Sequence, residues 1–358
     1  MSLNLSEGTI SRRPTREITV GGLKLGGKNP IRVQSMTTPK TEDVEAVLKQ
    51  IQDLVTAGCE IVRVTVNDQE AADALPQILQ RVTVPIVADI HFDYKMALES
   101  LKHGVDCIRI NPGNIGAEWK TIEVIKAARD LGKAVRIGVN AGSLEKPLLK
   151  KYGHPTPEAL VESAMNAIEL VEKQDFYNFK VSIKSSDVIN NYRAYALLSE
   201  RTEAPLHLGV TESGTKTYGS IKSAVGIGSL LLAGIGDTIR VSLSCDPVDE
   251  VKAGVYILKS IGLKNDMPEI IACPSCGRAD IDVYRLAEEV ERRALGLGKN
   301  IKIAVMGCVV NGPGESMEAD IGIAGGKGEG LVYKKGKPIG KVPEAQMLDF
   351  LMQEIERM

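Results

Sequence analysis

Four residues in the last quarter of the chain form a pattern that could carry chemistry. Cys273 and Cys276 stand in Cys-Pro-Ser-Cys, and Cys308 and Glu315 stand in Gly-Cys-Val-Val-Asn-Gly-Pro-Gly-Glu. Thiolates are the usual ligands of iron-sulfur clusters, and a hard carboxylate oxygen binds a thiolate-rich iron more weakly than sulfur does. The pattern is typical of a cluster held by three cysteines, with Glu315, read as part of a Gly-Pro-Gly turn, as a fourth ligand that a substrate oxygen can displace.

The same spacing fits two other kinds of site. A structural zinc site prefers four cysteine or histidine ligands, whereas no cysteine follows Cys308 and no histidine follows His207. A Cys-x-x-Cys pair is also found in reducible dithiols. Spacing alone leaves the iron-sulfur, zinc and dithiol interpretations open.

Composition narrows the class of protein. The 358 residues are 43% hydrophobic, which is enough for a substantial core and allows two or three domains. The net charge of -2 and the aromatic content of 4% argue against nucleic-acid binding. No apolar run approaches the roughly 18 residues of a membrane span, and Met1 to Glu17 has no signal-peptide core. We expect a cytoplasmic protein that does not enter a membrane.

Eight apolar runs alternate with stretches in which apolar residues recur at three-to-four spacing, as they do in Asp43 to Ala57 and Pro157 to Glu172. Alternating strands and helices imply parallel strands joined by right-handed crossovers, and eight units in about 260 residues match a (β/α)8 barrel of the TIM type. The predicted strands are Ile31 to Met36, Glu60 to Val66, Pro85 to His91, Cys107 to Asn111, Ala134 to Asn140, Phe179 to Ser185, Pro205 to Glu212 and Thr238 to Ser244.

The predicted strands alternate polar with apolar residues, although buried parallel strands are normally apolar throughout. Arg109 and Asn111 share one face of their strand, as do Arg136 and Asn140. Since Val, Ile and Leu must face the helices, the polar set faces the barrel interior near the carboxyl ends of the strands, where barrel active sites lie. Any one arginine could form a core ion pair with Asp89 or Glu212, but several buried cations together indicate a phosphorylated or diphosphate ligand.

After Leu263 the pattern changes. The short polar linker Lys264 to Glu269 leads into a mixture of short strands, a charged helix around Val283 to Leu295 and a closing helix at Pro343 to Ile355. We therefore predict a barrel domain over residues 1–263 and a small α+β domain over 264–358 that contains all the candidate cluster ligands.

Long, ordered motifs from both predicted domains resemble those of the 4-hydroxy-3-methylbut-2-enyl diphosphate synthases of the two-domain bacterial type. The likeness spans nearly the whole chain. The motifs are Val33-Gln-Ser-Met-Thr, Ala88-Asp-Ile-His, Arg109-Ile-Asn-Pro-Gly-Asn, Arg136-Ile-Gly-Val-Asn, Val181-Ser-Ile-Lys, Cys273-Pro-Ser-Cys-Gly-Arg and Met306-Gly-Cys-Val-Val-Asn-Gly-Pro-Gly-Glu.

The resemblance implies reductive ring opening of 2-C-methyl-D-erythritol 2,4-cyclodiphosphate in isoprenoid precursor biosynthesis. It implies two electrons delivered by flavodoxin or ferredoxin through a 4Fe-4S cluster, and a homodimer in which the cluster domain of one chain serves the barrel of the other. Cys273, Cys276 and Cys308 would hold three irons, Glu315 would cap the fourth, and Glu212 would move protons. The residues implied to bind the substrate are Arg63, Arg109, Asn111, Arg136, Asn140, Lys184, Arg240 and Ser242.

Overall fold

The computed structural model describes residues 5–6 and 9–358 of the chain. Its contacts divide the chain into two compact units, one ending at Ile261 and the other spanning Gly262–Met358. Within the described residues, none of the helices is both long and apolar enough to span a bilayer.

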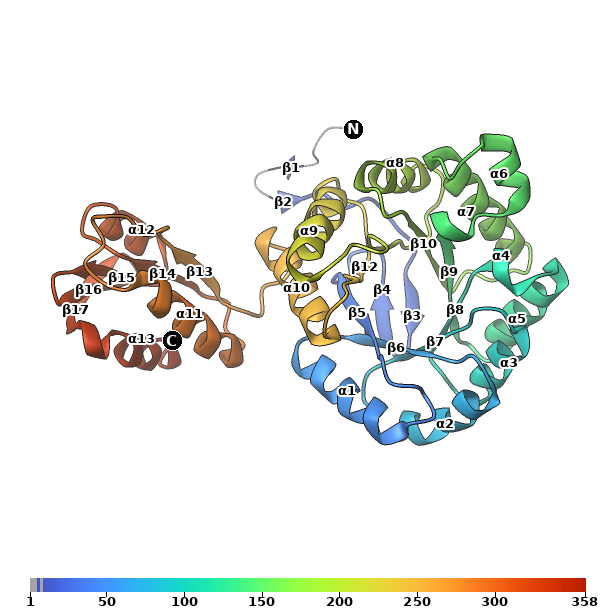
Figure 1. Ribbon diagram of the computed structural model, residues 1–358, viewed down its shortest axis with the longest axis horizontal. Helices are drawn as coiled ribbons and strands as arrows, with labels where there is room; N and C mark the ends of the chain where they lie inside the picture. The colour runs from blue at the N-terminus through green and yellow to red at the C-terminus, as the bar shows by residue number, and fades with distance from the viewer. Residues whose placement is uncertain (1–4, 7–8) are drawn as a thin grey trace. The chain divides into compact units, whose positions relative to one another are not determined.

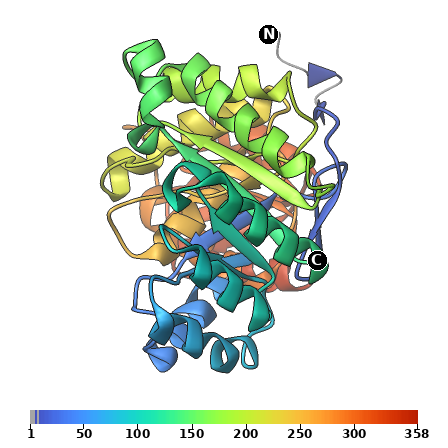
Figure 2. The same cartoon turned by 90° about the vertical axis from the view of Figure 1, so that its right-hand side faces the viewer.

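The first unit is a ring of eight parallel strands surrounded by helices (Figures 1 and 2). Hydrogen-bonded neighbours follow the order β10-β9-β8-β7-β6-β5-β12-β11, and a bridge between Val181 and Leu206 links the two ends of that order. This confirms the predicted barrel. The strands are β5 (Arg32–Met36), β6 (Ile61–Thr65), β7 (Ile86–Asp89), β8 (Cys107–Ile110), β9 (Ala134–Asn140), β10 (Phe179–Lys184), β11 (His207–Leu208) and β12 (Thr238–Ile239).

The last two barrel strands are much shorter than the sequence predicts. Only His207–Leu208 and Thr238–Ile239 keep ladder pairing. A side chain at Gly209 would lie 2.8 Å from the Arg240 carbonyl oxygen, so the two backbones run unusually close just beyond the ladder. The apolar residues that follow are buried in irregular structure, which a pattern of hydrophobicity cannot distinguish from a strand.

Helices of the barrel unit follow the predicted apolar spacing and begin at identifiable caps. The side chain of Asp43 accepts a hydrogen bond from the Ala46 N–H at the start of α1, and Thr156 caps α7 through the Ala159 N–H. The helices are α1 (Val44–Thr56), α2 (Gln69–Leu79), α3 (Tyr94–Lys102), α4 (Pro112–Ile115), α5 (Glu118–Asp130), α6 (Lys146–Tyr152), α7 (Pro157–Glu172), α8 (Val188–Ser199), α9 (Lys216–Leu232) and α10 (Pro247–Ser260), with a 3-10 turn at Ala141–Ser143.

An N-terminal hairpin that the sequence reading missed closes the amino end of the barrel. It pairs β3 (Ile18–Val20) with β4 (Leu23–Leu25), and a two-residue pair, β1 (Leu5–Ser6) with β2 (Thr9–Ile10), precedes it. Its apolar residues form a buried cluster with the first residues of the barrel strands, including Ile61 and Cys107. Apolar side chains therefore fill the amino end of the barrel, and the polar part of the interior lies further toward the carboxyl ends of the strands.

The second unit is a five-stranded sheet in the order β13-β14-β15-β16-β17, parallel for its first three strands and antiparallel for the rest. Its main core lies between the sheet and two helices, and a smaller cluster around Ala304, Met306 and Ala319 forms separately. The elements are β13 (Glu269–Ala272), α11 (Val283–Ala294), β14 (Lys302–Met306), α12 (Gly312–Glu318), β15 (Ile321–Gly326), β16 (Glu329–Lys334), β17 (Lys337–Pro343) and α13 (Met347–Glu356), with 3-10 turns at Leu295–Leu297 and Glu344–Gln346.

Two features of this unit differ from the sequence reading. β17 was not predicted, because the sequence of its residues is typical of a turn followed by the start of the closing helix. The Gly-Pro-Gly segment is also not a turn, since Gly312–Glu318 forms α12 with Pro313 in its first turn, a position where the missing N–H costs nothing. Glu315 therefore lies on a short helix.

Candidate active site

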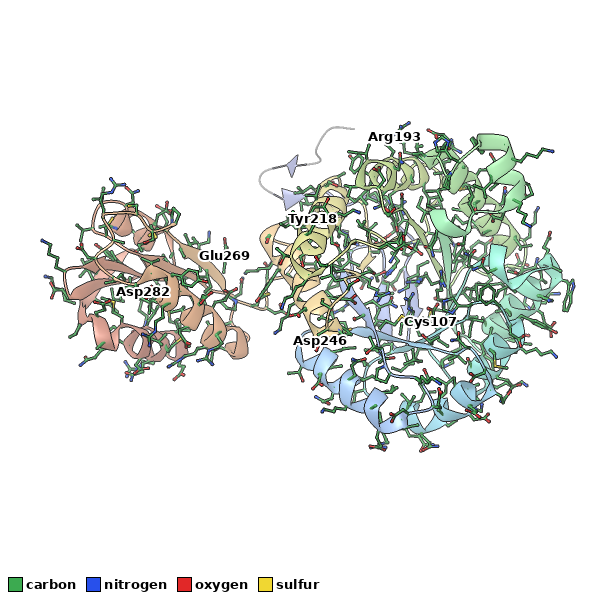
Figure 3. The ribbon with its side chains drawn as sticks, in the orientation of Figure 1. Cys107, Arg193, Tyr218, Asp246, Glu269 and Asp282 are labelled. Carbon is green, nitrogen blue, oxygen red and sulfur yellow. The ribbon has the colours of Figure 1, made fainter. Side chains whose placement is uncertain are left out.

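The barrel interior contains the predicted set of cations. Arg63 lies on β6, Arg109 on β8, Arg136 on β9 and Lys184 at the end of β10, and each is no more than 7% exposed. Arg240 immediately follows β12 and is half-buried. Side chains fill the space within the ring of strands (Figure 3). The strand period thus brings five distant cations to one region, as predicted.

Asp89 is the carboxylate that these cations surround. It is 2% exposed, and its oxygens lie 3.5 Å from Arg63 Nε and 3.2 Å from Arg109 Nη1. Burial alone would raise the pKa of Asp89, but Arg63, Arg109 and Arg136 outweigh burial and hold the pKa at about 2. Asp89 is ionised at neutral pH and offsets part of the positive charge.

Arg136 and Lys184 have no such partner among the described side chains, in which no carboxylate lies within 4.0 Å of either cation. Burial, followed by the repulsion of neighbouring cations, lowers the pKa of Arg136 to about 10 and that of Lys184 well below its ordinary value. Buried Nε and Nη1 of Arg136 also lack a hydrogen-bond partner within the described part of the chain. An anion would relieve both the repulsion and the unmet hydrogen bonding.

Two glycines make room for the cations. A side chain at Gly138 would lie 2.8 Å from Arg109 Nε, and one at Gly209 would lie 2.6 Å from Lys184 Nζ. Asn140, in the amide orientation that satisfies its neighbours, accepts a hydrogen bond from Arg109 Nη2 at 3.3 Å. The barrel backbone is therefore shaped around the charged groups.

Asn111 lies at the start of α4 rather than free in the barrel mouth. Its oxygen accepts from the Gly113 N–H at 3.1 Å, and its amide nitrogen donates to Ser143 Oγ at 2.9 Å. Those contacts fix the Asn111 side chain between two loops that follow β8 and β9.

Glu212 is exposed and lies in the loop after β11, on the side of the barrel where the strands end. Its φ of 52° is in the left-handed region, which is costly for a residue with a Cβ. The loop is secured around it, because Thr211 N–H donates to the Ser185 carbonyl at 3.3 Å and Ser213 Oγ donates to the Val210 carbonyl at 3.0 Å. Strained backbone of this kind is concentrated at functional sites.

Glu250 is a buried carboxylate beside Arg240 that the sequence analysis did not predict. This buried residue of α10 accepts a hydrogen bond from the Leu243 N–H at 2.7 Å and lies 3.5 Å from Arg240 Nη2. Nothing in the local sequence marks it, because a glutamate in the first turn of a helix is normally a solvated, dipole-compensating residue.

The three candidate cysteines of the second unit line one cavity of about 160 Å³. Cys273 follows β13 directly, Cys276 follows three residues later, and Cys308 lies just beyond β14. Parallel pairing of β13 with β14 places the ends of both strands at the same edge of the sheet. This register explains why cysteines more than thirty residues apart meet.

The loop around Cys273 and Cys276 is shaped by close contacts, and the surroundings of Cys276 favour its ionised form. The Gly307 N–H donates to Cys273 Sγ at 3.2 Å, and a side chain at Gly307 would meet Val283 at 2.6 Å. Hydrogen bonds from the backbone and side chain of Arg278 lower the pKa of the Cys276 thiol. Ser275, within the loop, has a φ of 53°. The backbone of loop 273–276 is therefore strained at a residue between its two cysteines.

Within the described residues, no three Cys, His, Asp or Glu side chains are grouped as ligands of a single metal ion. Glu315 is exposed on α12 and does not line the thiol cavity. Three thiols lining one cavity form a donor set that suits a thiolate-bound metal ion or an iron-sulfur cluster.

The chain combines a (β/α)8 barrel that has a cationic interior with an α+β unit in which three thiols line one cavity, the architecture of a two-domain enzyme. Residues 15–255 match the family described as the GcpE TIM-barrel domain, and residues 269–357 match the GcpE protein C-terminal domain. The chain belongs to the GcpE family.

Two curated relatives share one name. The chain is 55% identical to a 4-hydroxy-3-methylbut-2-en-1-yl diphosphate synthase (flavodoxin) of Caldanaerobacter subterraneus subsp. tengcongensis, over 97% of this chain and 98% of the relative. It is 53% identical to the protein of the same name from Clostridium perfringens, over 97% of this chain and 99% of the relative. A crystal structure of Plasmodium falciparum HPPK-DHPS matches 69% of this chain and 51% of its own, with a TM-score of 0.50 and 13% identity, and supports the barrel fold alone.

Proposed function

We propose that this chain catalyses the reductive ring opening and dehydroxylation of 2-C-methyl-D-erythritol 2,4-cyclodiphosphate to 4-hydroxy-3-methylbut-2-enyl diphosphate, a step in isoprenoid precursor biosynthesis. The observation that carries the proposal is the 55% identity, across both units, to a relative named as the flavodoxin-dependent synthase. In the reaction the substrate accepts two electrons, the bond between a ring carbon and a phosphate oxygen breaks, and the C3 hydroxyl leaves as water.

The cationic interior of the barrel is the proposed substrate site. Arg63, Arg109, Arg136, Lys184 and Arg240, with Asn111, Asn140 and Ser242, would bind the cyclic diphosphate. The burial of four of these cations supports this role, as does the lack of a carboxylate beside Arg136 and Lys184 among the residues that the structure describes. As the ring opens, negative charge develops on the departing diphosphate oxygen, and fixed cations in a water-poor site stabilise it strongly.

Cys273, Cys276 and Cys308 would hold a 4Fe-4S cluster, and Glu315 is the proposed fourth ligand. Such a cluster supplies one-electron transfers that no side chain can perform. The shared cavity of the three thiols supports the first part. Glu315 lies on α12, whose first residue, Gly312, lines the same cavity.

Glu212 is the proposed acid that delivers a proton to the departing hydroxyl. Its place beyond β11, on the carboxyl side of the barrel, and its left-handed backbone support this role. A positioned acid of this kind contributes about 10²-fold to 10⁴-fold to rate.

Flavodoxin is the proposed electron donor because it appears in the names of the relatives, and ferredoxin is the alternative. A homodimer that uses the thiol unit of one chain with the barrel of the other also remains a proposal from the family resemblance. The cytoplasmic location stays a prediction from composition.

Turnover tests the proposed function directly. Protein purified without oxygen and supplied with the cyclic diphosphate and reduced flavodoxin should yield the linear diphosphate, identified by mass spectrometry. The matched control is Cys308→Ser, whose barrel is untouched. Failure of the wild-type protein to consume the cyclic diphosphate, with its cluster intact, would refute the proposal.

A further inference from the structure

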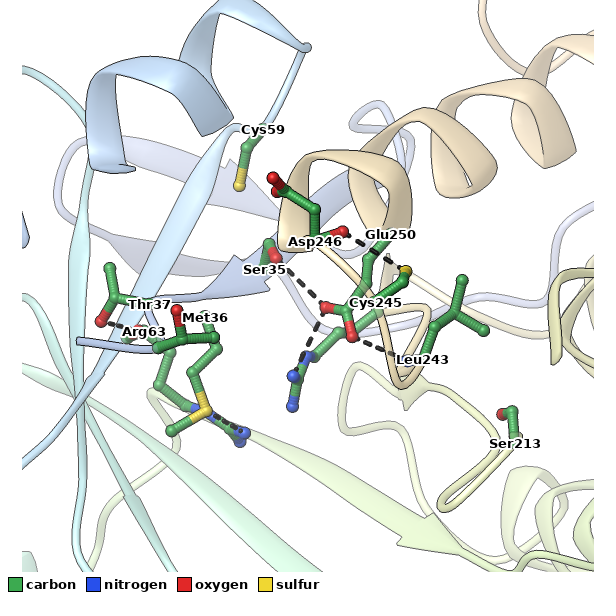
Figure 4. Close-up of polar contacts among 12 residues, drawn as sticks. Ser35, Met36, Thr37, Cys59, Arg63, Ser213, Leu243, Cys245, Asp246 and Glu250 are labelled. Carbon is green, nitrogen blue, oxygen red and sulfur yellow. Dashed lines mark hydrogen bonds and ion pairs between the residues drawn. The ribbon is translucent and has the colours of Figure 1, made fainter. Parts of the chain in front are cut away.

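Glu250 joins three parts of the barrel mouth. Its Oε1 accepts from the Leu243 N–H at 2.7 Å, and its Oε2 lies 3.4 Å from Ser35 Oγ and 3.5 Å from Arg240 Nη2. Figure 4 shows the carboxylate between Ser35 on β5 and the loop at Leu243. One side chain from α10 therefore contacts β5, the cation after β12 and the loop backbone that follows it.

The fold brings Glu250 into this place by close packing of α10. A side chain at Gly254, one turn along the helix, would lie 3.2 Å from Val33 Cγ1 and 3.6 Å from Ile239 Cδ1. The absence of a Cβ lets the first turns of α10 approach β5 and β12 closely. Glu250 is 5% exposed as a result, so its charge is compensated by these few partners rather than by water.

The contacts of Glu250 bracket the segment Arg240–Leu243. Arg240 is bound at one end and the Leu243 N–H at the other, and Ser242 lies between them. Arg240 Nε is buried and has no partner among the described residues, so Glu250 is the carboxylate that restrains this guanidinium there. A fixed guanidinium loses less conformational entropy when it binds an anion.

We propose that Glu250 is a positioning residue that holds Arg240 and Ser242 in the orientation that binds the substrate diphosphate. The inference rests on the proposed function and deepens it. Glu250 touches no substrate atom in this role, and its effect passes through Arg240 and the backbone at Leu243.

Whether Glu250→Gln weakens or strengthens anion binding distinguishes a positioning role from a purely electrostatic one. Glu250→Gln keeps the size of the side chain and an acceptor for the Leu243 N–H, and it removes one negative charge close to Arg240. If charge alone mattered, the more positive site would bind an anion more tightly. If Glu250 orients Arg240, binding becomes weaker despite the added positive charge.

A matched control exists at the opposite end of β5. Glu60 accepts from Arg32 Nη1 and, at 3.1 Å, from the Val33 N–H, so it also joins an arginine to a backbone amide. Glu60→Gln therefore removes the same kind of link without touching Arg240 or the segment that follows it. Glu250→Gln should lose more thermal stability than Glu60→Gln, because the Glu250 side chain is the more deeply buried of the two.

The experiment measures KM and kcat for the cyclic diphosphate, and the affinity for inorganic diphosphate by calorimetry, in wild type, Glu250→Gln, Glu60→Gln, Arg240→Ala and the double variant Arg240→Ala/Glu250→Gln. We expect Glu250→Gln to raise KM and the diphosphate dissociation constant about tenfold with kcat changed less. Glu60→Gln should leave both constants unchanged. In the Arg240→Ala background, Glu250→Gln should add less than about twofold, because the two residues act through one interaction.

Unchanged or tighter diphosphate binding in Glu250→Gln, beside weakened binding in Arg240→Ala, would overturn the positioning role while leaving the proposed function intact. Lack of turnover in wild type would instead refute the proposed function. If Glu250→Gln does not fold, Ser35→Ala removes one of the three restraints and should raise KM about twofold to threefold. No change in that variant would then count against the inference.

Discussion

Asp89→Asn tests two points about the cations of the barrel interior. The first is that one carboxylate holds them together, and the second is that they carry excess positive charge that an added anion can neutralise. Asp89 lies within 3.5 Å of both Arg63 and Arg109 and is 2% exposed. Asparagine keeps the shape and removes the charge. Three buried arginines would then repel one another with no carboxylate between them.

The magnitude follows from the ion pairs and the pKa. The pKa of Asp89 falls from an ordinary 3.8 to about 2, which corresponds to about 2 kcal/mol of folding stability at neutral pH. Breaking a buried ion pair by removing one partner costs about 3 to 5 kcal/mol. For a unit of this size, a loss of about 2 to 5 kcal/mol lowers Tm by about 5 to 20 °C.

Scanning calorimetry of the full chain measures this loss, with Glu45→Gln as control because the Glu45–Arg81 pair is exposed. Inorganic diphosphate should raise Tm more in Asp89→Asn than in wild type, since it replaces the missing charge. A depressed carboxyl pKa stabilises the fold above its unfolded pKa, and this contribution is lost as pH falls through the folded pKa. The Tm difference between the two proteins should therefore shrink between pH 3.8 and about 2. A Tm difference below about 1 °C at neutral pH would show that Asp89 does not hold these arginines together.

Further variants probe the other roles. Glu212→Gln should keep the affinity for the cyclic diphosphate and slow turnover about 10²-fold to 10⁴-fold, whereas Arg109→Ala should weaken binding as well. A raised KM with unchanged kcat in Glu212→Gln would exclude proton transfer. Glu212→Gly should retain or raise Tm, because glycine accepts the φ of 52° without strain, and should still lose turnover; a clear drop in Tm would argue against strain. Mixing Glu212→Ala with Cys308→Ser chains should restore roughly a quarter of wild-type turnover if the dimer shares its sites, and heterodimers confirmed by mass that show no recovery would exclude sharing.

The barrel and the inward position of its cations could be predicted because both follow from the regular spacing of polar and apolar residues along the sequence. Strand alternation put Arg109 and Arg136 on the inner face, and parallel strands end together. The short hairpin Ile18–Leu25 was missed, although its alternating apolar residues around Gly21 and Gly22 are a recognisable signal. The shortness of β11 and β12 could not be predicted, because polar and apolar residues continue to alternate after both strands, as in Arg240 to Leu243, although ladder pairing has ended.

Glu250 and α12 were missed for a different reason. The partners of Glu250 include Ser35, 215 residues away, and only tertiary packing brings them together. The Gly-Pro-Gly segment has low helix propensity, but α12 is held by packing, since a side chain at Gly312 would lie 2.7 Å from the Ala324 Cβ. Local propensity predicted a turn there, and tertiary contacts overrode it.

The identity of the group that the three cysteines hold is tested most directly by metal and sulfide analysis of protein purified without oxygen. We predict about four irons and four acid-labile sulfides per chain, with broad visible absorbance. Cys276→Ser should lose the iron, the sulfide and the absorbance while the barrel stays folded. One zinc per chain in a colourless, fully active protein would contradict this prediction.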